Sequence, residues 1–270
     1  MKKFKKILAL SLIFTCFIST VIPASASNRD YLETNNFTES NNLYSDKTNV
    51  QFIQTDITKD VIYTYEQNGL SYKVVENVED NLSKIHSSIY VKDVDGNYQL
   101  NTELDTIISS INSTNRMNES GFEIVLKENN KTIDSQKVLL PSNNIQNIDK
   151  TNSELTLRAT PQYKWVFDGT FKGNNKIEKY TLSGIVSIIA HISGTMSGNL
   201  ATSTAIAAAN FIAQTAIQEN FKVLYWTVKQ WTYKMYNGMY WFNTGCKTDN
   251  NYYSNSSRTK LIKHFTDIDV

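Results

Sequence analysis

The feature that most constrains the fold is a long apolar segment without a charged side chain. Between Lys179 and Glu219 the sequence contains no Asp, Glu, Lys or Arg, although 20% of the chain is charged. Exposing so much apolar surface to water is unfavourable, so the segment must pack inside protein or enter a lipid bilayer. It is also much longer than a typical strand, which favours helices.

The apolar segment divides into two predicted helices joined by a turn. The first arm, SGIVSIIAHIS, is about three helical turns long. Gly194 and Gly198 bracket Thr-Met-Ser, which suits a turn. The second arm, 199–219, approaches the roughly 20 helical residues that cross a bilayer core. We therefore predict an apolar helical hairpin over residues 182–218.

Alanines form a stripe of small side chains along the second arm, at Ala201, Ala205, Ala209 and Ala213. Such a stripe lets another backbone come close and is favoured in helix pairs within lipid. Two interpretations stay open. The hairpin is either permanent core packed on an aromatic sheet, or it is stored there and unpacks at a target membrane. In the second case the stripe and the turn glycines would pack the inserted helices.

Turn signals divide much of the remaining chain into strands. Asn68-Gly69 separates two runs in which apolar and polar residues alternate, a strong signal of a tight β-hairpin. Comparable signals occur at Val94-Asp95-Gly96, Asn129-Asn130 and Asn237-Gly238. A further helix is predicted over residues 101–113, where four residues fall at helical spacing: Leu104, Ile107, Ile108 and Ile111.

These patterns predict an α+β fold of two antiparallel β-rich units, the second carrying the inserted apolar helical hairpin. An acidic β-rich domain with one helix is expected at 51–140, and a basic aromatic β domain at 162–270. The polar segment 141–161 between them is predicted to be a linker. Arg158 in that linker offers a site at which an extracellular protease would separate the two halves.

The first 26 residues have the layout of a secretory signal peptide. A lysine-rich start precedes an apolar run, and Ala24-Ser25-Ala26 provides a cleavage site. We expect release after Ala26, an extracellular location, and a flexible leader at 27–50 that is rich in Asn, Ser and Thr. Cys246 is then the one cysteine of the secreted chain, and its polar, turn-like surroundings predict a solvent-exposed thiol, with intermolecular disulfide pairing as the alternative.

Charge and tryptophan are unevenly distributed. Residues 27–159 carry 12 Lys/Arg and 20 Asp/Glu, a net charge of −8, whereas residues 160–270 carry 11 and 6, a net charge of +5. All the tryptophans lie in the basic half: Trp165, Trp226, Trp231 and Trp241. We expect this half to face a target-cell membrane or an anionic wall polymer, with Trp226, Trp231 and Trp241 as interfacial aromatics. It is too weakly basic to predict nucleic-acid binding.

No motif indicates catalysis or a bound cofactor. The three histidines are far apart, and no paired His or Cys spacing typical of a metal site occurs. A nucleophile elbow and a phosphate-binding glycine loop are both missing from the sequence. We therefore predict a protein that is not an enzyme, with no catalytic residue, no metal and no cofactor.

The second half of the chain resembles a family of exported Gram-positive proteins. The resemblance lies in YKWVFDGTFKG, followed by YTLSGIVSIIAHISGTMSG, ATSTAIAAANFIAQTAI and KVLYWTVKQWTYKMY, and it is strongest over residues 160–270. This layout is similar to that of the large unmodified geobacillin bacteriocins. The resemblance implies killing or growth inhibition of related bacteria, and it brings no catalytic residues with it.

We therefore predict a secreted antibacterial protein that acts at the envelope or membrane of related Gram-positive bacteria. Self-association on membranes and a dedicated immunity protein are further hypotheses about its partners. The alternative is a secreted cell-wall or surface binding module without killing activity. In that alternative the helical hairpin is permanent core, and the aromatic surface holds glycans by stacking.

Overall fold

The structure, a computed structural model, describes residues 46–112, 119–141, 162–197, 202–236, 238 and 240–269. These residues belong to one compact unit, Asn42–Val270. Several sequence predictions lie outside the described residues: the signal peptide 1–26, the leader as far as residue 45, the linker after Pro141, Gly198 and Ala201.

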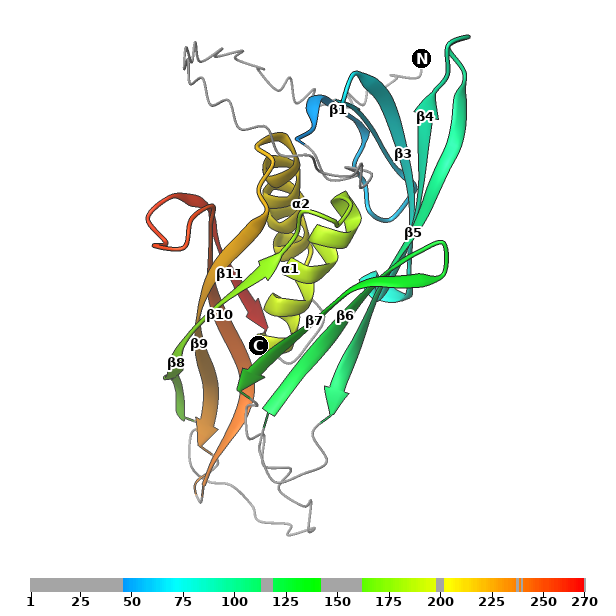
Figure 1. Cartoon of the computed structure of the whole chain (residues 1–270). Helices are drawn as coiled ribbons and strands as arrows, with labels where there is room; N and C mark the ends of the chain where they lie inside the picture. The colour runs from blue at the N-terminus through cyan, green and yellow to red at the C-terminus, as the bar shows by residue number, and fades with distance from the viewer. Residues whose placement is uncertain are drawn as a thin grey trace, which may run out of the picture. The chain divides into compact units, whose positions relative to one another are not determined.

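The described residues form two antiparallel sheets and two α-helices (Figure 1). Sheet A contains β1 (Thr48–Gln54), β2 (Val61–Gln67), β3 (Leu70–Glu79), β4 (Lys84–Lys92), β5 (Tyr98–Asn112), β6 (Glu119–Glu128) and β7 (Lys131–Pro141), paired in chain order. Sheet B contains β8 (Gln162–Lys176), β9 (Val223–Tyr236), β10 (Trp241–Tyr253) and β11 (Leu261–Asp269), with β8 and β11 at its edges. The helices are α1 (Leu182–Ser197) and α2 (Ser203–Gln218), and a short 3-10 helix covers Asp80–Leu82.

The predicted α+β class is wrong. Strands make up 63% of the described part of the chain, and the architecture is a large β-sandwich that holds two helices. Both helices fall within the predicted span 182–218, but they are not an insertion in the second unit alone. Helix α1 contacts β5, β6 and β7 of sheet A as well as β9, β10 and β11 of sheet B.

The helix predicted over residues 101–113 is also wrong, because residues 101–112 belong to β5. Thr102, Leu104, Thr106 and Ile108 are buried, whereas the residues between them are exposed or half-buried. This period of two is that of a strand. The β-branched residues favour a strand, and β5 pairs along its length with β4 and β6, so tertiary pairing outweighs the helical spacing.

The predicted hairpin turns are confirmed where the structure describes them. Asn68 and Gly69 both have positive φ and join β2 to β3, which explains the preference for Asn-Gly. Asn129 and Asn130 do the same between β6 and β7, and Gly96 has a positive φ between β4 and β5. Gly238, between β9 and β10, also has a positive φ. Local turn chemistry therefore fixes where these strands reverse.

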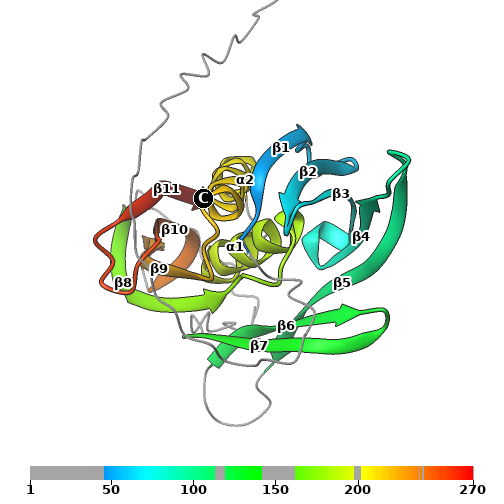
Figure 2. The same ribbon diagram turned by 45° about the horizontal axis from the view of Figure 1, so that its top comes forward.

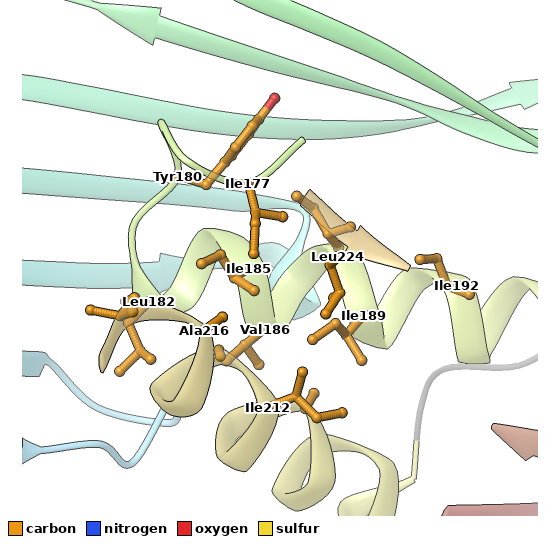
Figure 3. Close-up of a cluster of buried hydrophobic side chains, with 14 of the residues drawn as sticks. Ile177, Tyr180, Leu182, Ile185, Val186, Ile189, Ile192, Ile212, Ala216 and Leu224 are labelled. Carbon is orange, nitrogen blue, oxygen red and sulfur yellow. The ribbon is translucent and has the colours of Figure 1, made fainter. Parts of the chain in front are cut away.

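Helix α1 occupies the centre of the core. Every residue from Leu182 to Ala190 is buried, as are Ile192 and Ser193. Figure 2 shows α1 enclosed by the two sheets, with α2 lying between β1 and β11. Figure 3 shows Ile185, Val186 and Ile189 of α1 among side chains from α2, from β9 and from the segment before α1. A helix that is apolar on all sides requires such an environment.

Amide side chains link the edges of sheet A to the rest of the molecule. Gln136 of β7 donates a hydrogen bond to the carbonyl of Lys176 in β8 (2.8 Å) and accepts one from its N–H (3.1 Å). Asn220, just after α2, makes the same pair of bonds with the backbone of Lys47, before β1 (2.7 and 2.8 Å). Each side-chain amide thus bonds both the N–H and the C=O of one residue at a sheet edge, as a neighbouring strand would.

A fully buried carboxylate connects sheet A to the start of α1. Glu76 of β3 accepts hydrogen bonds from the N–H (2.9 Å) and the hydroxyl (2.7 Å) of Ser183. Ser87 adds a third bond at 3.3 Å. The positive end of the helix dipole favours a carboxylate here. Burial nevertheless raises the pKa of Glu76, and the hydrogen bonds only partly offset that effect.

The raised pKa predicts how stability depends on pH. As the pH falls from neutral, native Glu76 takes up a proton before the unfolded chain does, so protonation favours the native state. The wild-type protein should therefore gain stability relative to Glu76→Gln between neutral pH and about pH 5. Urea unfolding of both proteins across this range measures the difference. A difference that stays constant with pH would contradict the raised pKa.

Gly173 of β8 makes room for the indole of Trp226. A Cβ at this position would lie 2.1 Å from Cζ2 of Trp226, which is itself 4% exposed and donates a hydrogen bond to Asn175. Gly173→Ala should lower the free energy of unfolding by about 1–3 kcal/mol, because the indole must leave its site. Asn174→Ala, at the exposed neighbouring position, should stay within about 0.5 kcal/mol of wild type in the same denaturation assay. Equal stability of the two variants would show that the indole adjusts without cost.

Candidate aromatic and lysine surface of sheet B

Sheet B carries a cluster of aromatic side chains on its outer face. Cross-strand register places Trp165 opposite Tyr233 and Phe167 opposite Trp231, so these four side chains share one face. Tyr163 lies two residues before Trp165 and points to the same side. The opposite face of the sheet, with Leu224, Trp226 and Val228, packs into the core. We name Tyr163, Trp165, Phe167, Trp231, Tyr233 and Lys247 the aromatic face.

The rings of the aromatic face contact one another and remain accessible to solvent. Tyr163 and Tyr233 stack at 5.5 Å between ring centroids, Trp165 and Tyr233 lie 4.7 Å apart, and Phe167 and Trp231 lie 5.3 Å apart. Tyr163 is 52% exposed, Trp165 is 38% exposed and Phe167 is 54% exposed. A contiguous group of exposed aromatic rings on a sheet face indicates an interaction surface.

Lys247 of β10 places a cation beside these rings. Register sets it opposite Trp231, and its Nζ lies 4.4 Å from a ring centroid of Trp231 and 5.4 Å from one of Trp165. The contact is within the range of a cation–π interaction. The surface therefore combines ring planes with a positive charge.

The other face of the same sheet end carries a second group, which we name the inner tip: Lys164, Lys234, Tyr236 and Trp241. Lys164 and Lys234 are direct cross-strand partners, and so are Tyr236 and Trp241. Nζ of Lys164 lies 3.9 Å from the ring of Trp241, and the rings of Tyr236 and Trp241 are 5.3 Å apart. Within the described residues, neither lysine forms an ion pair with a carboxylate.

The inner tip lies beyond the part of sheet B that the helices cover, because sheet B is longer than the helices. Strand β9 has 14 residues and spans about 46 Å, whereas α1 and α2 have 16 residues each and span about 24 Å. The helices cover the inner face near Leu224 and Trp226, and the sheet continues beyond them (Figure 1). Aromatic side chains therefore reach solvent on both faces of this end: Trp165 is exposed on the outer face, and Tyr236 and Trp241 are half-buried on the inner one.

The structure brings only some of the predicted interfacial residues to this surface. Trp231 lies in the aromatic face and Trp241 in the inner tip. Trp226 is buried and hydrogen-bonded to Asn175, so its predicted interfacial position is wrong. The alternation of side chains along β9 explains this. Trp226 is on the face of the strand that points inward to the helices, whereas Trp231, an odd number of residues later, points outward.

The predicted alanine stripe lies on the buried face of α2. Ala205, Ala209 and Ala213 have no exposed surface, and α2 packs against α1. Gly194 is also buried, within α1 rather than in a turn. The 16 residues of α2 span less than the roughly 30 Å of a bilayer core. Among the described residues, no helix combines the length and the apolar character needed to cross a membrane.

No motif or spacing in the sequence marks Tyr163, Lys164, Phe167, Lys234 or Lys247 as surface residues. Trp165 and Phe167 alternate with polar residues, as in a strand, but this alternation does not reveal which side of the strand faces solvent. The lysine pair could not be found either, because Lys164 and Lys234 are far apart in the chain. Only the register of β8 with β9 brings them together.

Cys246 is not the exposed thiol that its polar neighbours predicted. It lies on the inner face of β10, is 6% exposed, and receives a contact from Nε2 of Gln230 at 3.7 Å. Burial raises the pKa of the Cys246 thiol to about 11. The apparent turn sequence around it is the middle of a long strand, in which every second residue faces inward.

Reaction with a thiol reagent tests the burial of Cys246. A pKa two units above the ordinary value reduces the thiolate fraction at neutral pH roughly 100-fold, and burial slows access further. Modification by an aromatic disulfide reagent should therefore be at least about 100-fold slower in the native protein than in urea. Equal rates in the two conditions would place the thiol at the surface.

The described residues also contain a small cavity, beside Lys47, Tyr180 and Asn220. Its volume of about 30 Å³ has room for one or two water molecules rather than for an organic ligand. Within the described ranges, no three His, Cys, Asp or Glu side chains are grouped so that they could hold a metal ion.

No family model, curated protein or solved structure matches this chain. Interpretation of the aromatic face and the inner tip therefore depends on their own chemistry.

Proposed function

We propose that this chain is a secreted antibacterial protein that binds the envelope of related Gram-positive bacteria through the aromatic end of sheet B. The observation that carries the proposal is the accessible group of aromatic rings and lysines in the aromatic face and the inner tip. Exposed contiguous aromatic surface is unfavourable in water unless a partner covers it. Bacterial envelopes offer anionic polymers and anionic lipids, and both are complementary to lysine.

Two parts of the proposal, secretion and the choice of target cells, are supported by the sequence. The layout of the first 26 residues supports export, and the resemblance of residues 160–270 to geobacillin-type bacteriocins supports inhibition of related bacteria. The charge distribution is consistent with this division of roles, because the basic half carries the aromatic surface. A dedicated immunity protein in the producing cell and self-association on the target membrane remain hypotheses of the same proposal.

This proposal does not require the two helices to leave the core. Helix α1 is enclosed by both sheets, and its removal would expose many fully buried side chains, including Ile188, Ile189 and Ile192. Burying each such side chain contributes about 1.5–3 kcal/mol. A surface that is already accessible can bind without this cost, so we assign binding to the end of sheet B.

Cell-binding and growth assays test the proposal. The purified secreted chain should sediment with Gram-positive cells and slow their growth. Trp165→Ala combined with Phe167→Ala should weaken cell binding by roughly tenfold or more, because exposed aromatic anchors dominate such contacts. The growth effect should weaken with it.

A matched control removes exposed apolar side chains elsewhere. Leu100 and Leu139 of sheet A are 54% and 56% exposed, so Leu100→Ala combined with Leu139→Ala should leave cell binding unchanged. If the aromatic variant bound cells as tightly as this control, the aromatic face would not be the binding surface. If the wild-type protein bound cells without affecting growth, the antibacterial part of the proposal would fail.

Ring stacking favours a second candidate, a glycan-binding module without killing activity. The rings of Tyr163 and Tyr233 are nearly parallel, with 16° between their planes, and such flat aromatic surfaces hold sugar rings. On this alternative, binding to purified peptidoglycan would account for all cell binding. Growth of the cells would then not change.

A further inference from the structure

We propose that the end of sheet B dips into the interface of an anionic phospholipid membrane, with Lys164 and Lys234 bound to lipid phosphates. This inference rests on the proposed function, since it names the component of the envelope that the surface recognises. It concerns the strand ends that carry the aromatic face and the inner tip, and not the helices.

The lysine pair is the observation that indicates an anionic ligand. Lys164 and Lys234 are direct partners across β8 and β9, on the inner face beyond the helices, where Lys164 is exposed and Lys234 is half-buried. Like charges at directly opposite positions destabilise a sheet. Within the part of the chain that the structure describes, no carboxylate pairs with either lysine. A phosphate bound between the two ammonium groups would remove the repulsion.

The indole beside the pair indicates where the phosphate lies. Trp241 holds Nζ of Lys164 at 3.9 Å from its ring, and Tyr236 packs against Trp241. Tryptophan and tyrosine prefer the level of the lipid headgroups, and lysine side chains reach the phosphates from there. The inner tip therefore combines the residue types that recognise the membrane interface.

The distribution of aromatics over both faces favours a membrane over a polymer chain. A linear glycan or wall polymer would lie along one face of the sheet, and the rings on the other face would stay in water. Here Trp165 and Tyr233 project from the outer face, whereas Tyr236 and Trp241 project from the inner one. Tyr240, which precedes β10, is 47% exposed at the same end. Insertion of this end of sheet B into the membrane interface would cover the aromatic rings on both faces of the sheet at once.

Binding to vesicles of defined composition tests the inference. The full secreted chain is titrated with vesicles of phosphatidylcholine alone and of phosphatidylcholine mixed with phosphatidylglycerol. It should partition into the anionic vesicles and only weakly into the neutral ones. Lipids brominated near the headgroup should quench tryptophan fluorescence in the anionic vesicles. Trp165→Phe combined with Trp231→Phe and Trp241→Phe should remove most of the quenching, because the remaining Trp226 is buried.

Charge-matched variants identify the lysines responsible. Lys164→Gln combined with Lys234→Gln should weaken partitioning roughly 30-fold, since each lysine near an anionic surface contributes about a factor of five. Lys172→Gln combined with Lys229→Gln removes the same charge from exposed positions away from this end, and should weaken partitioning less than about threefold. Circular dichroism checks that both variants fold like the wild type.

The outcomes separate this inference from the proposed function. If the wild-type protein bound cells and purified wall polymer but not anionic vesicles, the lipid inference would be overturned and envelope binding would stand. Equal losses in the two lysine variants would overturn the role of the inner tip. Failure to bind cells at all would overturn the proposed function. Binding of the wild-type protein to anionic vesicles, with a larger loss of partitioning in the Lys164/Lys234 variant than in the Lys172/Lys229 variant, would support the inference.

Discussion

The burial of α1 from Leu182 to Gly194, where only His191 is half-buried, is the constraint on which the rest of the structure depends. A helix that is apolar on every side must be covered on every side, and one twisted sheet covers only one side. Sheet A and sheet B supply two sides, and α2 fills the space between β1 and β11 (Figure 2). Three buried serine hydroxyls of α1 have partners outside the helix: Ser183 bonds to Glu76, Ser187 to the carbonyl of Leu82, and Ser193 to Asp267. The helix thus determines how both sheets are arranged around it.

The same arrangement creates the candidate binding surface. The helices cover the inner face of sheet B only over their own length, about 24 Å, so the longer strands β8, β9 and β10 continue past them. Side chains at this end lie beyond the helices, and those of the inner tip are half-buried or exposed rather than buried. The aromatic rings and lysines that stand there are therefore accessible. The length mismatch between helix and strand is the physical origin of the surface.

Much of the local structure was predictable because its causes are local. The Asn-Gly turn at Asn68 needs positive φ at two positions, and few other residues accept this conformation. The two helices in 182–218 followed from an apolar segment too long for a strand. Residues 101–113 could not be assigned correctly, because Leu104, Ile108 and Ile111 satisfy a helical spacing while Leu104, Thr106 and Ile108 satisfy a strand spacing. Pairing of β5 with β4 and β6 decides between them.

By itself, the sequence determined that a charge-free segment must be buried, where the hairpins turn, and that the aromatic residues gather in the basic half. It could not determine that both halves share one core, because their contacts join residues far apart in the chain, such as Glu76 and Ser183. Only the tertiary structure decided which tryptophan faces outward and that Lys164 faces Lys234. Strand register makes these choices, because a shift of one residue moves every side chain to the opposite face.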